Sequence, residues 1–148
     1  DRSGGRLKRE DVGMYSLCLA IFERNLDLNM ARLLLAAGAN PNMANRNGNT
    51  PLRWAIDHKN LPMVQLLLDH HADPNTIYNG KTLLGWAIDR NNVAMVQVLM
   101  NSGRLDQDII DAEKLTLEAE QNIAFQAGQD WPKIKHQILN TLTAGVYI

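Results

Sequence analysis

Four histidines are the side chains best suited to acid–base or metal chemistry near neutral pH, namely His58, His70, His71 and His136. No two of them stand four residues apart, the spacing that places two imidazoles on one face of a helix to hold zinc. His70 and His71 are adjacent, so their side chains diverge, as is typical of histidines that satisfy the last carbonyls of a helix. The histidines therefore predict no metal site.

The single cysteine and the glycines provide no catalytic motif either. Cys18 excludes an intrachain disulfide, fits a reducing compartment and is expected to be a small, mostly buried thiol. The glycines near the N-terminus are not spaced as in a dinucleotide-binding or phosphate-binding loop. We therefore expect no catalytic residue, no cofactor and no metal, and hence no enzyme activity in the chain itself.

Two carboxylates and two indoles recur at one fixed separation along the chain. Asp57 and Asp89 could flank a substrate, and Trp54 and Trp86 could hold a ligand between them. Recurrence with a period favours a structural role instead, as part of the scaffold for the aspartates and as packing between repeated units for the tryptophans.

These residues belong to a phrase that occurs twice, NGNTPLRWAID at 47–57 and NGKTLLGWAID at 79–89. The same shift of 32 residues carries MVQLL at 63–67 onto MVQVL at 95–99. The match therefore spans a whole structural unit, and a fixed period of this size is typical of a repeat protein.

Weaker copies flank the two strong ones. GANPN at 38–42 matches HADPN at 71–75, and WPKIKHQIL at 131–139 resembles the second half of a unit. The segment before that last match predicts a longer helix, roughly from Asp111 to Ala127, closed by Gly128. We expect this C-terminal part to be a degenerate fourth unit.

Each strong unit contains the signals of a helical hairpin. Asn-Gly starts a tight turn in which φ is positive. Thr50 then caps a short helix, and Pro51 fits its first position. Leu52, Ala55 and Ile56 form one apolar stripe, and a second helix has the same apolar spacing. Because two such short helices do not bury their apolar faces alone, neighbouring units must stack.

The second helix is expected to end at His71, in the left-handed conformation that Gly38 and Gly103 take in the other units. That conformation strains a residue with a Cβ atom by about 1–2 kcal/mol.

A period near 33, the phrase G-x-T-P-L-x-x-A and the ending G-A-x-P-N together resemble ankyrin repeats, over about Gly13 to Gly103 and more loosely beyond. The resemblance implies an all-α solenoid of stacked helix-turn-helix units with short hairpin loops. We expect a tail or linker at 1–12, repeats at 13–103 (about 13–44, 45–76 and 77–105) and C-terminal capping helices at 106–148.

The sequence departs from the family at the position after T-P-L. The family's histidine is replaced by Cys18, Arg53 and Gly85, which suggests weaker local hydrogen bonding. Gly85 within a helix costs about 1 kcal/mol against alanine. Close approach of a partner or of Trp54 would explain that glycine, and so would drift in a degenerate repeat.

The resemblance also implies a function, because ankyrin repeats usually bind partner proteins through the hairpin tips and the exposed side of the first helices. We expect a protein-interaction module without catalysis, that is, a scaffold. The alternative is a targeting or regulatory region of a larger enzyme or of a secreted bacterial effector.

Ile77 and Tyr78 are the strongest indication of an interface, since apolar residues at an exposed turn are typical of residues that anchor a partner. An arrangement in which Ile77 packs under the hairpin is equally consistent with the sequence. Carried onto this chain, the partner-binding positions are Met43, Arg46, Asn47, Asn49, Arg53, Asp57, His58, Ile77, Tyr78, Asn79, Lys81, Asp89 and Arg90, with Ala44, Asn45 and Gly85 among them at the tips and the helix face.

Composition agrees with a binding module. The chain has 148 residues, 45% of them hydrophobic, and a net charge of −1. This balance lacks the basic footprint of a nucleic-acid binder, and no apolar run reaches the roughly 18 residues that span a bilayer. We therefore expect another protein as the partner, with no nucleic acid and no membrane, and a chain that is monomeric by itself. We expect a cytoplasmic location, or the host cell cytoplasm or nucleus for a secreted effector.

Overall fold

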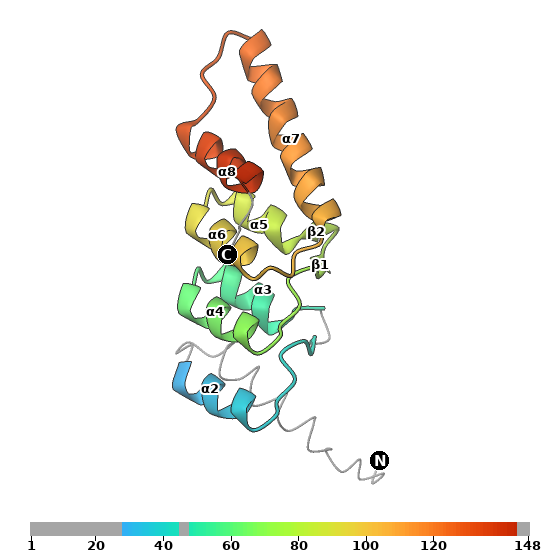
Figure 1. Ribbon diagram of the computed structural model, residues 1–148, viewed down its shortest axis with the longest axis vertical. Helices are drawn as coiled ribbons and strands as arrows, with labels where there is room; N and C mark the ends of the chain where they lie inside the picture. Colours follow the sequence, from blue (N-terminus) through green and yellow to red (C-terminus); the bar gives the residue numbers. More distant parts are fainter. Residues whose placement is uncertain (1–27, 45–47, 145–148) are drawn as a thin grey trace. The chain divides into compact units, whose positions relative to one another are not determined.

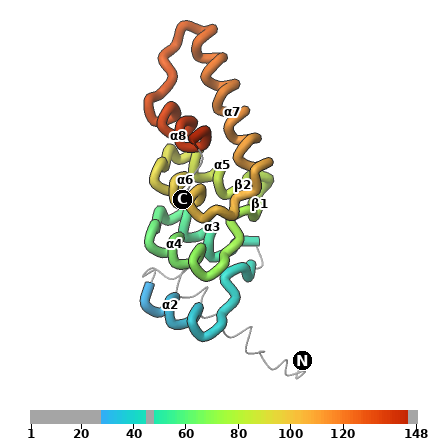
Figure 2. Tube along the Cα trace, in the orientation of Figure 1, coloured from blue at the N-terminus to red at the C-terminus, as the bar shows by residue number. Residues whose placement is uncertain are grey.

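The computed structural model describes residues 28–44 and 48–144. The chain divides into two compact units, with the boundary between Ala72 and Asp73. The described residues form helices and one short hairpin (Figures 1 and 2). The elements of the first unit are α2 (Leu28–Ala36), α3 (Pro51–Asp57) and α4 (Leu61–Asp69). Those of the second unit are β1 (Ile77–Tyr78), β2 (Lys81–Thr82), α5 (Leu83–Asp89), α6 (Val93–Asn101), α7 (Gln107–Gln126) and α8 (Lys133–Ala144).

In the first unit, α3 and α4 form a helix pair, and α2 packs against α4. The pair is held by the apolar stripe that the sequence predicts, since Leu52, Ala55 and Ile56 are buried. Val64 and Leu67 of α4 have no exposed surface. The expected stacking of neighbouring units through their apolar faces is thus present here.

The second unit contains two helix pairs that stack. The pair α5–α6 follows the hairpin, α7 packs against α5, and α8 packs against both α6 and α7. Leu84 and Ala87 are buried, as are Ile138 and Leu142 on α8. The predicted all-α fold of paired helices is confirmed, and its core consists of the residues that recur with the period.

The helix starts repeat atom for atom between the two strong units. The hydroxyl of Thr50 accepts a hydrogen bond from the backbone N–H of Arg53 at 3.3 Å, and that of Thr82 accepts one from Gly85 at 3.0 Å. These caps satisfy backbone donors that the first helical turn leaves unpaired.

The second helix of each pair begins at an asparagine cap that sequence reasoning missed. Oδ1 of Asn60 accepts from the N–H of Met63 at 3.1 Å, and Oδ1 of Asn92 accepts from Met95 at 3.0 Å. The two asparagines stand one period apart, so the signal was present in the repeat.

The turns contain the left-handed residues that the sequence predicts. His71 has φ +68°, which confirms the left-handed conformation expected at the end of α4. Lys59 and Asn91, one period apart, also have positive φ in the turn within each helix pair. Asn79 and Gly80 both have positive φ, the combination that a two-residue hairpin turn requires.

The start of the long C-terminal helix differs from the sequence prediction. The long C-terminal helix begins at Gln107 and not near Asp111, because Asp106 occupies the N-cap position and the chain is already tied down there. It ends at Gln126, and Gly128 follows with φ +69°, as predicted. The predictions for residues 1–27, including the tail and Cys18, and for the terminal residues 145–148 lie outside the described part of the chain.

Candidate partner-binding surface

Trp86 is the centre of the best-formed surface cluster in the second unit. Its indole is half-buried on α5, and Nε1 donates a hydrogen bond to the backbone carbonyl of Tyr78 at 3.4 Å. The ring centroids of Tyr78 and Trp86 are 6.4 Å apart with an angle of 48° between the planes, a tilted arrangement that aromatic pairs favour. The tryptophan thereby fixes the hairpin against the helix.

Two cations lie over the same indole. Nζ of Lys81 is 5.5 Å from the ring centroid of Trp86, and Cζ of Arg90 is 5.8 Å from it. Both distances are within the range of cation–π attraction, which contributes about 0.5–1 kcal/mol at exposed sites. Lys81 also forms an ion pair with the carboxylate of Asp89. Two cationic groups, one of them paired with a carboxylate, therefore border this aromatic surface.

Ile77 lies next to this cluster with 65% of its surface exposed. It pairs with Thr82 in the hairpin, while Tyr78 pairs with Lys81. The alternative in which Ile77 packs under the hairpin is therefore wrong, and it is Tyr78 that covers Trp86. We call this cluster the hairpin surface, and it consists of Ile77, Tyr78, Lys81, Trp86, Asp89 and Arg90.

The first unit presents a different pattern at the equivalent positions. The imidazole of His58 stacks on Trp54, with centroids 5.1 Å apart and planes 18° from parallel. Nδ1 of His58 is 2.8 Å from the backbone carbonyl of Trp54, so that nitrogen donates. The guanidinium of Arg53 donates to Oδ1 of Asn49 at 2.9 Å. These contacts connect neighbouring side chains on α3, and the imidazole of His58 remains exposed.

Two positions expected at the surface are buried. Asn49 is only 6% exposed, because its side chain accepts from Arg53 and lies at the foot of α3. Gly85 is buried because Oε1 of Glu113 on α7 approaches it, and a Cβ atom there would be 2.8 Å from that oxygen. The atom that comes closest to a Cβ at this position is thus the flexible end of Glu113, from the chain itself.

The remaining predicted positions divide by exposure. Trp86 was expected to pack in the core and is instead half-buried on the surface. Arg46 and Asn47, with Asn45 beside them, lie outside the described residues. The half-buried positions are Met43, Arg53, Asp57, Tyr78, Lys81 and Arg90, and the exposed ones are Ala44, His58, Ile77, Asn79 and Asp89.

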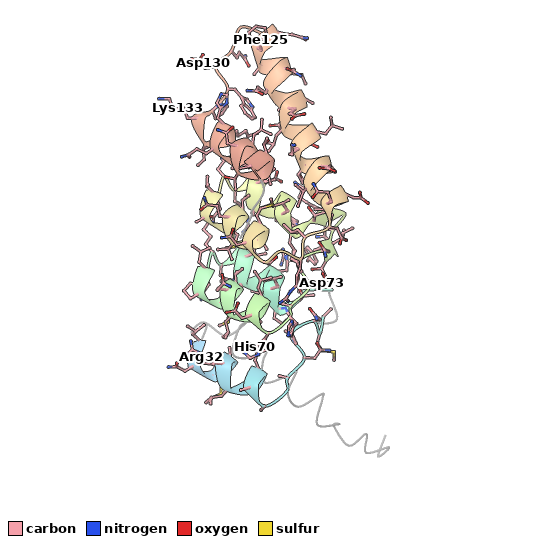
Figure 3. All side chains as sticks on the ribbon, viewed as in Figure 1. Arg32, His70, Asp73, Phe125, Asp130 and Lys133 are labelled. Atoms are coloured by element: carbon pink, nitrogen blue, oxygen red, sulfur yellow. The ribbon has the colours of Figure 1, made fainter. Side chains whose placement is uncertain are left out.

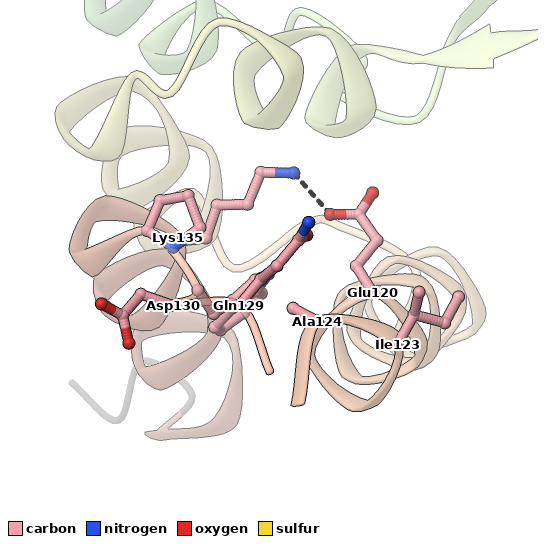
Figure 4. Close-up of a pocket in the computed structure, with 8 residues that line it drawn as sticks. Glu120, Ile123, Ala124, Gln129, Asp130 and Lys135 are labelled. Atoms are coloured by element: carbon pink, nitrogen blue, oxygen red, sulfur yellow. Dashed lines mark hydrogen bonds and ion pairs between the residues drawn. The ribbon is translucent and has the colours of Figure 1, made fainter. Parts of the chain in front are cut away.

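A hollow lies between α7 and the loop before α8. Its volume is about 400 Å³, and Trp131, Pro132 and Ile123 supply its apolar wall. Lys135 and Glu120 form an ion pair across it (Figure 4). The ring of His136 meets the edge of Trp131, with centroids 4.7 Å apart. The charges of Lys135 and Glu120 therefore neutralise each other. The lining residues of the hollow include no set of groups arranged for catalysis.

Other kinds of site were sought over residues 28–44 and 48–144. No group of three His, Cys, Asp or Glu side chains there is arranged to hold a metal ion. Nor does this part of the chain contain a helix with the length and apolar character needed to cross a bilayer. Among the described residues, the hairpin surface is thus the arrangement best suited to recognition.

Comparison with known proteins defines the class. The sequence profile of ankyrin repeats matches the chain in three copies over residues 17–112. This match covers more than half of the chain, includes the pairs α3–α4 and α5–α6, and ends near the start of α7. The chain belongs to the ankyrin repeat family, whose repeats generally mediate protein–protein interactions.

Individual relatives share only the repeats. The chain is 46% identical over 56 residues to the ankyrin repeat and LEM domain-containing protein 1 homolog of Caenorhabditis elegans, which is 38% of this chain and 8% of that protein. It is 49% identical over 45 residues to an ankyrin repeat-containing protein of Treponema pallidum, 30% of this chain and 15% of that protein. It is 35% identical over 60 residues to the NAD-dependent deacetylase sir2B of Dictyostelium discoideum, 40% of this chain and 8% of that protein. The chain therefore spans a small fraction of the length of these relatives.

Proposed function

We propose that the chain is a protein-interaction module that binds its partner through the hairpin surface. The observation that carries this proposal is the 65% exposure of Ile77 beside an indole that two cations approach. An exposed isoleucine next to Trp86 and Tyr78 supplies an apolar anchor with a polar rim, and aromatic and arginine residues dominate the binding energy of protein interfaces.

The charges of the hairpin surface favour a partner with carboxylates near its apolar anchor. Lys81 and Asp89 are 40% and 52% exposed at their side chains, and an ion pair this exposed contributes at most about 1 kcal/mol. A carboxylate of the partner therefore replaces Asp89 at little cost. The planar guanidinium of Arg90 is suited to a two-pronged contact with a carboxylate. The partner segment that fits is apolar at its centre and acidic at its edge.

Affinity purification on the immobilised chain, followed by mass spectrometry, identifies the candidate partner, and titration of the purified pair measures the dissociation constant. We expect Ile77→Ser and Arg90→Gln to weaken binding by on the order of tenfold each, because each removes a hot-spot contact. Leu33→Ser is the matched control, since Leu33 is 67% exposed on α2 of the other unit. Circular dichroism must show unchanged helix content. Undiminished binding by both hairpin variants would reject the proposal.

A second candidate function is a targeting region within a longer enzyme. The observation that favours it is the match, 35% identical over 60 residues, to 8% of a protein named as an NAD-dependent deacetylase. Sequencing the gene on both sides of the segment tests this candidate, and an adjoining open reading frame without a catalytic domain would reject it. The hairpin surface would serve the same recognition role in either case.

A further inference from the structure

One face of α7 is apolar although none of the described residues of its unit covers it. Ile110 and Leu117 are the buried residues of this helix. At 100° per residue, the opposite face consists of Ala112, Leu115, Ala119 and Ile123, which we call the α7 stripe. All four are exposed, with Leu115 at 68% and Ile123 at 67%.

Exposed apolar residues in this helical spacing are more than scattered surface positions. Leu115, Ala119 and Ile123 follow one another at i, i+4 and i+8, so they form one continuous ridge along α7. The ridge ends beside the hollow of Figure 4, because Ile123 also lines that hollow. Phe125, which is 83% exposed, lies at the same end of the helix (Figure 3). A face of this kind is typical of a helix that has a binding partner.

The charge of α7 is strongly one-sided. The helix has five acidic residues and one basic residue, Lys114. Glu113 accepts from the hydroxyl of Thr82, and Glu120 pairs with Lys135, so both are engaged within the unit. The other three acidic residues are exposed and form no ion pair within the described part of the chain, and they are Asp108, Asp111 and Glu118.

Two of these carboxylates, those of Asp111 and Glu118, lie along one edge of the α7 stripe, and Asp108 lies beyond its N-terminal end on the same face. Asp111 and Glu118 stand two helical turns apart, and Leu115 lies between them on the adjoining ridge. Asp111 accepts a hydrogen bond from the amide of Gln107 at 2.9 Å, which leaves its charge unneutralised. The surface therefore combines an apolar ridge with a negative border.

We propose that the α7 stripe binds an amphipathic helix of a partner protein, one with apolar residues at i and i+4 and with lysine or arginine along its edge. A helix of 20 residues presents a straight ridge, and the side chains of a second helix pack into its grooves. Basic residues beside the partner's apolar stripe would then meet Asp111 and Glu118, as border charges do in coiled coils. This surface lies on a different element from the hairpin surface and is independent of it.

The negative border also argues against other occupants. Two copies of α7 laid against each other would bring Asp111 and Glu118 close to the same carboxylates of the second chain, which is unfavourable. An anionic membrane surface would repel the same groups. A basic helix is the occupant that satisfies both the apolar and the charged part of the face.

Fluorescence anisotropy with the whole chain tests the proposal. The probe is a labelled helical peptide of about 18 residues, or five turns, with leucine at i and i+4 and lysine elsewhere. Its charge-inverted control has glutamate in place of each lysine. We expect the lysine peptide to bind at least about tenfold more tightly than the glutamate peptide, because only the former complements the border.

Variants of the chain locate the binding. We expect Leu115→Ser with Ile123→Ser, and separately Asp111→Lys with Glu118→Lys, each to weaken binding of the lysine peptide by about tenfold or more. The matched controls are Leu33→Ser and Asp69→Lys, which make the same changes at exposed positions of the other unit and are expected to bind as the unchanged chain does. Equal binding by the stripe variants and the controls would overturn the proposal.

Sedimentation equilibrium and vesicle binding test the other occupants. A dimer of the chain that Leu115→Ser with Ile123→Ser abolishes would assign the stripe to a second copy and overturn the proposal. Binding to vesicles with anionic headgroups that the same variant abolishes would assign it to a membrane, with the same consequence. Because Ile77→Ser leaves α7 intact, we expect it to bind the lysine peptide normally, which separates this result from the test of the hairpin surface.

Discussion

The side-chain amide of Asn75 donates a hydrogen bond of 2.8 Å to the backbone carbonyl of Arg104, twenty-nine residues further along the chain. Its Oδ1 accepts a second one, also of 2.8 Å, from the N–H of Asp106 at the start of α7. In the first unit, Asn42 donates in the same way to the carbonyl of His71 at 3.2 Å, again across twenty-nine residues. The asparagine that ends each G-A-x-P-N phrase thus ties one repeat to the end of the next.

We expect Asn75→Ala to destabilise the chain by about 1–3 kcal/mol, because two backbone groups lose their partner at once. Asn42→Ala removes the hydrogen bond to the carbonyl of His71 and is also expected to lower the free energy of unfolding. Urea unfolding followed by circular dichroism measures both free energies of unfolding. An unchanged free energy of unfolding in Asn75→Ala would contradict this account of the amide.

The asparagine caps give a second prediction. We expect Asn60→Ala and Asn92→Ala each to lower the free energy of unfolding by about 1 kcal/mol, the usual cost of losing an N-cap. Asn101→Ala is the control, because Asn101 is exposed at the last position of α6 and caps no helix start, so its effect should stay within about 0.5 kcal/mol. Equal free energies of unfolding for all three variants would show that the two caps do not stabilise the helices.

The repeating part of the fold could be predicted from the sequence for a physical reason. The helix signals of α3 act on residues close by in the sequence, namely the cap at Thr50, Pro51 at the first position and the apolar stripe. The helix can therefore be predicted from a short stretch of sequence. The cores of neighbouring repeats must match, so their residues recur with the period. Buried Leu52 and Leu84 illustrate this, since each is the same residue at the same point of its unit.

The candidate site was predictable only in part. The prediction singled out Ile77 and Tyr78 but left open which of them is buried, because an apolar residue in a hairpin fits either face. It placed Asn49 at the surface, since sequence alone does not show that Arg53 binds its side chain. It also treated Gly85 as open, because the position of Glu113 depends on how α7 packs on α5, a contact outside the repeating pattern.

The contact between Gly85 and Glu113 leads to a third prediction, which a double-mutant cycle tests. Gly85→Ala gains about 1 kcal/mol in helix propensity. This gain is offset because the new methyl group displaces the Glu113 carboxylate, which in the unchanged chain accepts a hydrogen bond of 3.0 Å from the Thr82 hydroxyl. The displaced end is a flexible side chain, so we expect a net change near zero.

In a Glu113→Ala background, the same Gly85→Ala change should be more favourable than in the unchanged chain, because the contact with the carboxylate is gone. The contacts of the new methyl group with Cγ of Lys81 at 3.0 Å and Oγ1 of Thr82 at 3.2 Å remain in both backgrounds. Thermal and urea unfolding of the four proteins in the cycle measure the coupling between the two sites. A coupling energy of zero would show that the carboxylate does not determine the need for glycine.

The left-handed residue at the end of α4 provides the last prediction, together with its neighbour as control. His71 has φ +68°, and its contacts in the turn use backbone atoms, since its N–H donates to Leu68 and its carbonyl accepts from Asn42. Glycine keeps both hydrogen bonds and removes the strain on Cβ, while it makes the unfolded chain more flexible. We therefore expect His71→Gly to stabilise the chain by about 0.5–1 kcal/mol.

His70 has φ −96°, an ordinary value, so His70→Gly should instead destabilise the chain by about 0.5–1 kcal/mol. Opposite signs for adjacent histidines in urea unfolding are the expected result, and a loss of stability in both variants would mean that the turn is not strained at His71.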